Sequence, residues 1–178
     1  MTTNILLAGF GGQGILFADK QLAKMAMDTD LQVSWLPSYG PEMRGGAANC
    51  SVIISDEEIG SPLVVNPDLL IAMNLPSFEK FEPAVKEGGL VIYDSALIPA
   101  KSERGDIKAA GIPATSMASE AGLTGMANVI LLGYALKLTG LFEYEAFLAH
   151  MIEGIPPAKA ALIEKNKKAL EMGYNYAE

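Results

Sequence analysis

The chain has 178 residues, half of which are hydrophobic, and a formal net charge of -8. This length suits one domain with a buried core, so we expect a single domain over residues 1–178. The 13 Lys and Arg are scattered among 21 Asp and Glu, which argues against binding to nucleic acid or to an anionic membrane. No apolar run approaches the roughly 18 to 20 residues that span a bilayer, and the N-terminal segment lacks a secretory-signal pattern, so we expect a cytoplasmic protein.

The pattern of apolar residues predicts alternating strands and helices. Short apolar runs suited to strands lie at residues 4–9, 32–36, 48–54, 69–73 and 90–93, and a sixth strand is expected near 112–117. Helical spacing occurs at 15–27, 77–86, 123–138, 143–152 and 157–172. This order predicts the α/β class: a single-domain, doubly wound, mostly parallel sheet with helices on both faces, Rossmann-like in its arrangement.

A glycine-rich turn separates the first predicted strand from the first helix. Gly9, Gly11 and Gly14 give the G-x-G-x-x-G spacing within GFGGQG. Such glycines permit a tight turn and a close backbone approach, and the free amides at the start of the next helix attract an anion. A phosphate or pyrophosphate is therefore the expected ligand. The alternative is that the glycines serve only to pack the helix closely on the strand.

A usual dinucleotide site also needs an acidic residue at the end of the second strand, where it binds the ribose hydroxyls. Here the second strand ends in Pro37 and Ser38, while Asp28 and Asp30 precede it. This argues against an NAD-dependent dehydrogenase. It leaves open another phosphorylated ligand for the glycine-rich turn.

The second strand is followed by the unusual segment LPSYGPEMRGGAANCSVIIS, which places Glu42 and Arg44 beside paired glycines. An arginine in such a position can bind a phosphate or a carboxylate through two hydrogen bonds. The alternative is a rigid surface loop in which Glu42 and Arg44 pair with each other. The single cysteine, Cys50, has no partner at metal-ligand spacing and is expected to be a buried structural thiol.

Together, GFGGQGILFADKQLA and WLPSYGPEMRGGAANCSVIIS resemble the gamma subunit, or fused gamma domain, of the 2-oxoacid:ferredoxin oxidoreductases, which act on pyruvate, 2-oxoglutarate, 2-oxoisovalerate or indolepyruvate. The similarity extends from about residue 3 to 175. It implies that an oxoacid is decarboxylated on thiamine diphosphate, that electrons leave through iron-sulfur clusters to ferredoxin, and that the acyl group passes to coenzyme A. The second segment, followed by ISDEEIGSP, looks most like the 2-oxoglutarate branch.

The resemblance implies that this chain receives coenzyme A and supplies no catalytic acid, base or nucleophile. Carried onto matching positions, the family pattern gives the phosphate contacts Gly11, Gly12, Gln13 and Gly14, the further pocket residues Ser38, Tyr39, Gly40, Glu42, Arg44, Gly45 and Gly46, and an additional contact at Asn128. We expect Arg44 to neutralise charge, and Gln13 and Ser38 to donate or accept hydrogen bonds. Replacing Arg44 by Ala should leave folding intact and weaken coenzyme A binding in a calorimetric titration.

The resemblance also implies a subunit that is catalytically inactive by itself. The complete enzyme would oxidise the oxo group of its donor and reduce an iron-sulfur protein. Its expected partners are alpha and beta subunits, with or without a ferredoxin-like delta subunit, and ferredoxin through the complex. Thiamine diphosphate, magnesium and the clusters would be bound by those partners, and no metal by this chain. A homodimer of the isolated chain and a freestanding nucleotide-binding module remain as alternatives. The segment PSYGPEMRGG favours the oxidoreductase, because a generic nucleotide binder needs no such second loop.

Overall fold

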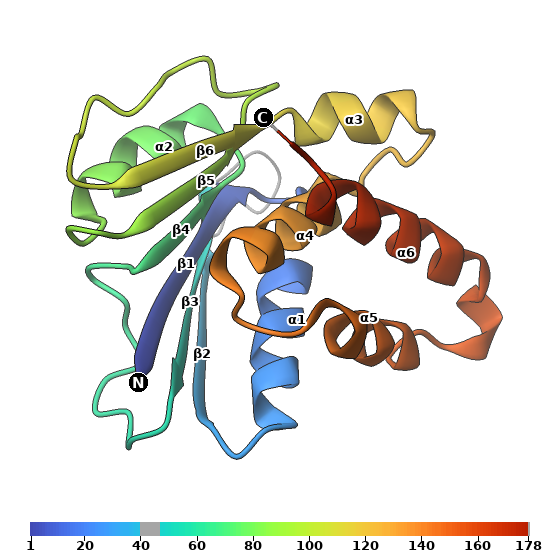
Figure 1. Ribbon diagram of the computed structural model, residues 1–178, viewed down its shortest axis with the longest axis horizontal. Helices are drawn as coiled ribbons and strands as arrows, with labels where there is room; N and C mark the ends of the chain where they lie inside the picture. Colours follow the sequence, from blue (N-terminus) through green and yellow to red (C-terminus); the bar gives the residue numbers. More distant parts are fainter. Residues whose placement is uncertain (40–46, 178) are drawn as a thin grey trace.

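The computed structural model describes residues 1–39 and 47–177, with the backbone but not the side chain of Tyr39. Figure 1 labels the helices and strands in chain order. They are β1 (Thr2–Phe10), α1 (Ile15–Met27), β2 (Gln32–Tyr39), β3 (Ala47–Ser55), β4 (Leu69–Ala72), α2 (Leu75–Phe81), β5 (Leu90–Asp94), β6 (Lys108–Ile112), α3 (Ala114–Glu120), α4 (Ala127–Thr139), α5 (Tyr144–Glu153) and α6 (Ala161–Tyr174). Two short 3₁₀ turns, Glu82–Ala84 and Pro157–Lys159, follow α2 and precede α6.

The strands form one six-stranded sheet in the order β2-β3-β1-β4-β5-β6. The pairs β1–β4, β4–β5 and β5–β6 are parallel, whereas β3 is antiparallel to both of its neighbours, β1 and β2. The predicted α/β fold with a mostly parallel sheet is confirmed. The antiparallel strand arises because β3 follows β2 without an intervening helix, and a directly connected neighbour must return in the opposite direction.

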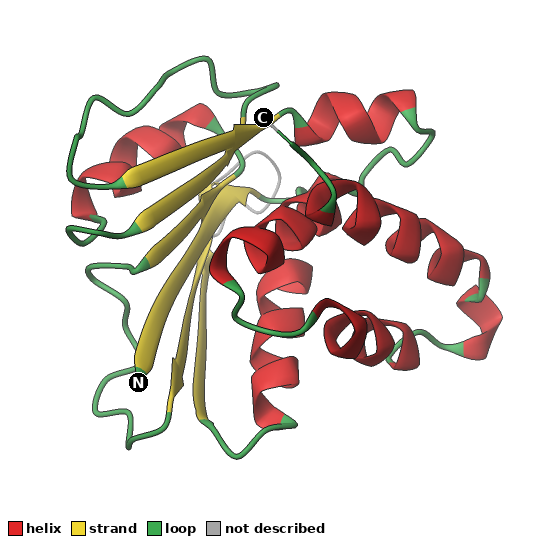
Figure 2. Cartoon of the chain, in the orientation of Figure 1, coloured by secondary structure: helices red, strands yellow, loops and turns green. Residues whose placement is uncertain are grey.

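Helices cover both faces of this sheet, as Figures 1 and 2 show: α1, α4, α5 and α6 lie on one side and α2 lies on the other. The larger apolar cluster lies under the four helices, and a smaller one under α2 and the loop after β3. The central strand β4 is buried along its whole length, which explains its continuous apolar sequence. Apolar burial on both faces therefore fixes the middle of the sheet.

Two glycines let α4 and α6 approach each other until their backbones touch. A Cβ atom at Gly133 would lie 2.1 Å from the carbonyl oxygen of Leu170, and one at Gly173 would lie 1.8 Å from that of Ile130. No side chain larger than hydrogen fits at either position without moving a helix. No helix in the described part of the chain is both long and apolar enough to cross a membrane.

The structure corrects three of the predicted boundaries. The strand predicted at 112–117 is wrong: β6 ends at Ile112, and the next residues form α3 after Pro113, which cannot donate a hydrogen bond to a sheet. The helix predicted from 123 begins at Ala127, because Gly122 and Gly125 have positive φ and keep the preceding segment in turns. Strand β2 continues through Pro37, which an edge strand tolerates.

Candidate functional site

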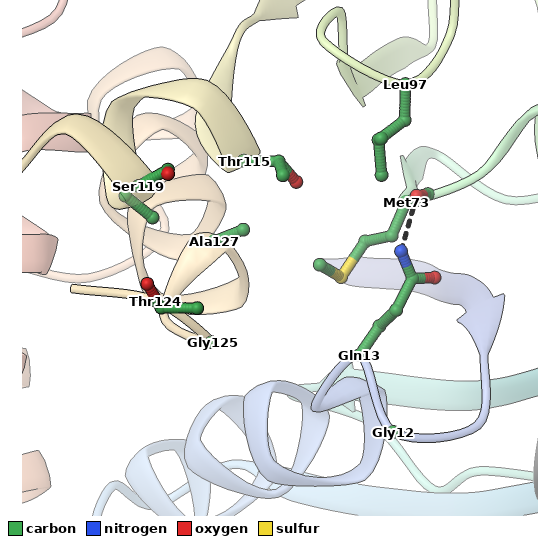
Figure 3. Close-up of a pocket in the computed structure, with 10 residues that line it drawn as sticks. Gly12, Gln13, Met73, Leu97, Thr115, Ser119, Thr124, Gly125 and Ala127 are labelled. Carbon is green, nitrogen blue, oxygen red and sulfur yellow. Dashed lines mark hydrogen bonds between the residues drawn. The ribbon is translucent and has the colours of Figure 1, made fainter. Parts of the chain in front are cut away.

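The strands β1, β4, β5 and β6 run parallel and end together at one edge of the sheet, which is where an open α/β sheet places its binding crevice. A cavity of about 340 Å³ opens at this edge. Figure 3 shows residues from the glycine loop, the position after β4, the loop after β5, α3 and the start of α4 around it. Its described lining consists of Gly12, Gln13, Met73, Leu97, Thr115, Ala118, Ser119, Thr124, Gly125 and Ala127.

The glycine loop between β1 and α1 is held in shape by Gln13. The Gln13 Oε1 atom accepts a hydrogen bond from the Phe10 amide at 2.6 Å. Its Nε2 atom donates to the Met73 carbonyl oxygen at 2.9 Å, the bond drawn as a dashed line in Figure 3. Gly12 and Gly14 have φ angles of 95° and 80°, which favour glycine strongly over other residues. The loop is thus closed on itself and fastened to the end of β4.

Two helices start beside this loop without a side-chain cap. The N-cap positions of α1 and α4, Gly14 and Met126, make no side-chain hydrogen bond to their helices. The Asn128 Nδ2 atom donates to the Gly14 carbonyl oxygen at 3.1 Å, which holds the two helix starts together. Since the first amides of a helix and its dipole both attract anions, the two starts together make the loop a favourable place for a phosphate group.

Asp94, at the end of β5, builds the opposite wall of the cavity. This carboxylate is fully buried; its Oδ2 atom accepts hydrogen bonds from the Thr115 amide at 3.1 Å and the Thr115 hydroxyl at 2.5 Å. Its Oδ1 atom accepts one from the Ala96 amide at 3.1 Å. The Asp94 backbone carbonyl also accepts a hydrogen bond from the Leu97 amide. Asp94 therefore places both Leu97 and Thr115 against the cavity.

None of the described residues that line the cavity is charged. Its walls are mainly apolar, from Met73, Leu97 and alanines, with the hydroxyl groups of Thr115, Ser119 and Thr124 among them. Such a lining suits an uncharged part of a ligand, with orientation set by a few hydroxyl groups. A positive side chain for phosphate would have to come from outside this lining, and Arg44 is the one Lys or Arg between Lys24 and Lys80 in the sequence.

The structure brings together part of the predicted set of coenzyme contacts. Gly12 and Gln13 line the cavity, Gly11 and Gly14 belong to the same loop, and Asn128 is buried against Gly14. Ser38 is exposed near the end of β2 and Tyr39 ends that strand. The remaining predicted contacts, Gly40, Glu42, Arg44, Gly45 and Gly46, lie outside the described residues. The assignment of these residues to coenzyme A stays a prediction.

Sequence reasoning missed most of the cavity wall, including Asp94 and Thr115. One available signal was an aspartate placed directly after an apolar strand, in LVIYD, at the edge where parallel strands end. Another was the glycine pair at Gly122 and Gly125 before α4, which marks a turn near that edge. Neither signal by itself would have shown that α3 completes the wall.

Nearly the whole chain matches a protein family. The model of the pyruvate ferredoxin/flavodoxin oxidoreductase family aligns with residues 4–176. The chain belongs to this family. The resemblance that the two glycine-containing segments indicated is thereby confirmed.

Relatives within this family carry several substrate names. The ketoisovalerate oxidoreductase subunit VorA of Methanothermobacter thermautotrophicus is 42% identical over 97% of this chain, which spans only 36% of that relative's length. The 2-oxoglutarate synthase subunit KorC of Methanocaldococcus jannaschii is 36% identical over 100% of this chain and 95% of its own. The chain therefore corresponds to about a third of one relative and to nearly the whole of the other.

Solved structures agree with this assignment. The keto/oxoacid ferredoxin oxidoreductase gamma subunit of Geobacter sulfurreducens superposes with a TM-score of 0.84 at 31% identity, covering 98% of this chain and 95% of that one. The 2-oxoglutarate:ferredoxin oxidoreductase of Magnetococcus marinus, solved with 2-oxoglutarate, coenzyme A and succinyl-CoA bound, has a TM-score of 0.86 at 22% identity. It matches 97% of this chain and 30% of its own, and at that identity it shows the fold alone. The chain is thus of the gamma-subunit type.

Proposed function

We propose that this chain holds coenzyme A for a multi-subunit 2-oxoacid:ferredoxin oxidoreductase. The observation that carries the proposal is the cavity at the strand ends, bordered by a glycine loop and two uncapped helix starts. Coenzyme A has a phosphorylated end and a long uncharged arm. The glycine loop and helix amides suit the phosphates, and the neutral cavity lined by Met73, Leu97 and hydroxyl groups suits an uncharged part of the coenzyme.

The proposal includes partner subunits, because the chain spans 36% of the ketoisovalerate relative and matches 30% of the Magnetococcus chain. Thiamine diphosphate, magnesium and iron-sulfur clusters would be bound by those partners, and electrons would reach ferredoxin through them. Among the described residues, no three His, Cys, Asp or Glu side chains gather as metal ligands. A cytoplasmic location is part of the same proposal.

The proposed oxoacid is 2-oxoglutarate, supported by the motif resemblance and by the relative KorC, whose length this chain matches. The second candidate is 2-oxoisovalerate, supported by the 42% identity to VorA. The experiment that separates them is purification of the chain from its host under anaerobic conditions, with its accompanying subunits, followed by coenzyme A-dependent reduction of a viologen dye. Succinyl-CoA formation from 2-oxoglutarate supports the first candidate. Faster reduction of the dye with 2-oxoisovalerate would instead make 2-oxoisovalerate the substrate.

A cavity-filling variant tests the coenzyme site directly. Ser119 on α3 lines the cavity, whereas Ser116 on the same helix is exposed and is absent from the lining. Ser119→Phe should raise the KM for coenzyme A by about tenfold or more, because the ring would occupy space that the ligand needs. Ser116→Phe adds the same ring to the same helix and should leave that KM unchanged. Equal behaviour of the two variants would remove the cavity from the proposal.

A further inference from the structure

The strand β2 forms an edge of the sheet and carries no charge. It is eight residues long, with the sequence QVSWLPSY. Because β2 is the last strand on its side of the sheet, one side of its backbone has no neighbouring strand. Exposed edge strands in proteins are usually short or carry charged residues, which prevent pairing with other chains. An uncharged edge of this length therefore indicates a surface that another chain covers.

The position of Pro37 shows which backbone groups of β2 point to the open side. Pro37 lies opposite Cys50 in the antiparallel ladder, and because proline has no N–H group, this pair cannot be a hydrogen-bonded one. Bonded and non-bonded pairs alternate along an antiparallel ladder, so Trp35 and Val33 also form non-bonded pairs with β3. Their N–H and C=O groups point away from β3. The open edge thus offers hydrogen-bond donors and acceptors to a further strand.

A loop beside β2 adds apolar side chains to this edge. Leu36 is paired with Ser51 of β3, so their side chains share one face of the sheet. The Ser51 hydroxyl oxygen accepts a hydrogen bond from the Val64 amide at 3.2 Å, which places the loop after β3 over that face. The residues on either side of Val64, Leu63 and Val65, are 58% and 67% exposed, and Leu36 is 36% exposed. Helix α2 packs on β1 and β4 and lies away from β2 (Figure 1), so these side chains stay exposed.

The charges of the chain and the lengths of its relatives indicate what covers this edge. The segments at the end where β2 begins and β3 ends, DTDL at residues 28–31 and DEEIG at 56–60, contain acidic but no basic residues. A second copy of this chain would bring another net charge of -8 against the first, which disfavours self-association. The region matched here is 36% of the ketoisovalerate relative, so that relative has further polypeptide that can pack on this domain. A partner other than a second copy is therefore favoured.

We propose that the β2 surface, formed by the open edge of β2 with Trp35, Leu36, Leu63 and Val65, is the docking site of a partner subunit of the oxidoreductase, which adds a strand beside β2. The proposal rests on the multi-subunit function proposed above. The partner contributes backbone groups opposite Val33 and Trp35, and apolar side chains against the exposed ones. It also contributes Lys or Arg residues at the acidic end, because complementary charges favour association with this partner over others.

The first test purifies the tagged chain anaerobically from its host and measures the amount of each identified oxidoreductase subunit per tagged chain. Val65→Asp and Leu36→Asp should each lower the recovery of the docked subunit by about tenfold or more, because the contact would bury an unpaired carboxylate. Ala109 is exposed on β6, the other edge strand, and Ala109→Asp should leave that recovery unchanged. Urea unfolding of the three variants should match that of the wild type, since each new carboxylate lies at an exposed position.

Hydrogen exchange tests the added strand. The amides of Val33 and Trp35 should exchange about tenfold more slowly or better in the purified complex than in the isolated chain, because each would donate a hydrogen bond to the partner's strand. The amides of Ser34 and Leu36 belong to the bonded pairs with β3, so their exchange should change less. Unchanged exchange at Val33 and Trp35 in the complex would overturn the added strand.

The outcomes for the wild type separate this inference from the proposed function. If the wild-type chain is recovered with its partner subunits, and Val65→Asp and Leu36→Asp retain them, the β2 surface is not the docking site and the proposed function stands. If the wild-type chain is recovered alone, the proposed function fails and the inference fails with it. If the wild-type chain forms a homodimer that both variants abolish, a second copy covers the β2 surface and the inference is wrong.

Discussion

The glycine loop before α1 and the contact between α4 and α6 both depend on glycine, for different physical reasons. At the helix contact, Gly133 and Gly173 are in helical conformation, and what excludes a side chain is the backbone of the other helix. In the loop, Gly12 has open space around its Cβ position, and what excludes a side chain is the backbone angle. Gly14 combines a positive φ with the close approach of Asn128.

This difference distinguishes a glycine that serves helix packing from one that can serve ligand binding. A glycine that faces another helix leaves no room for a ligand, because protein atoms fill the space. A glycine such as Gly12, which borders a cavity and has open space beside it, leaves its amide free to approach one. Glycine counts in a sequence do not distinguish the two cases, whereas the surroundings of each Cβ position do.

The largest expected effect is at the helix contact. Gly173→Ala should lower the free energy of unfolding by about 3 kcal/mol or more, because the new Cβ overlaps the Ile130 carbonyl oxygen and forces α4 and α6 apart. Urea unfolding monitored by circular dichroism measures the loss. Gly154→Ala is the matched control: its Cβ would lie 3.7 Å from the nearest described atom, and its φ of -71° suits alanine. Similar losses for both variants would contradict the close helix contact.

The next effect is at the glycine loop. Gly14→Ala should lower the free energy of unfolding by about 2 kcal/mol. Part of this loss comes from the positive φ and part from the overlap of the new Cβ with the Asn128 side chain. In a protein that already carries Asn128→Ala, the same substitution should lower the free energy of unfolding by about 1 kcal/mol, since only the backbone strain remains. A double-mutant cycle in urea measures this coupling. Full additivity of the two substitutions would show that the side chain of Asn128 does not crowd Gly14.

A smaller effect is expected at the cavity wall, where Asp94 holds the start of α3. Asp94→Asn should lower the free energy of unfolding by about 1–2 kcal/mol, because the amide nitrogen cannot accept the hydrogen bonds that the carboxylate oxygen accepts. The same variant should weaken coenzyme A binding in a calorimetric titration, since Thr115 and the turn at Ala96 lose hydrogen bonds to the Asp94 side chain. Asp106→Asn changes an aspartate that is absent from the described cavity lining and pairs with Arg104, and it serves as the control.

The smallest expected change in stability is a gain, whereas the variants above lose stability. Because burial raises the pKa of Asp19 on α1 in the folded protein, stability is lost as the pH rises from the ordinary aspartate range through that raised value. Asp19→Asn has no such titration, so it should match the wild type at acid pH and exceed it by about 1 kcal/mol at neutral pH. Thermal unfolding from pH 4 to pH 8 measures the difference. A constant difference over this range would show that Asp19 does not titrate there.

The sequence by itself determined the fold class, the glycine loop and the family. Continuous apolar runs are local signals, because a strand covered on both faces has no polar alternation, as β4 illustrates. The turn GFGGQG is also local, since the backbone angles of Gly12 and Gly14 depend on the residues themselves. The family followed from two segments of sequence, the glycine turn with the start of α1 and the segment that begins within β2 and ends with β3.

Only the tertiary structure decided the rest. The antiparallel direction of β3, the addition of α3 to the cavity wall and the contact of α4 with α6 join residues far apart in the chain, for which the sequence pattern contains no pairing information. The burial of Asp19 is of the same kind. An aspartate on an amphipathic helix usually faces water, and only the packing of α1 under β2 and β3 turns it into a buried carboxyl group, because burial is a property of the neighbours and not of the residue.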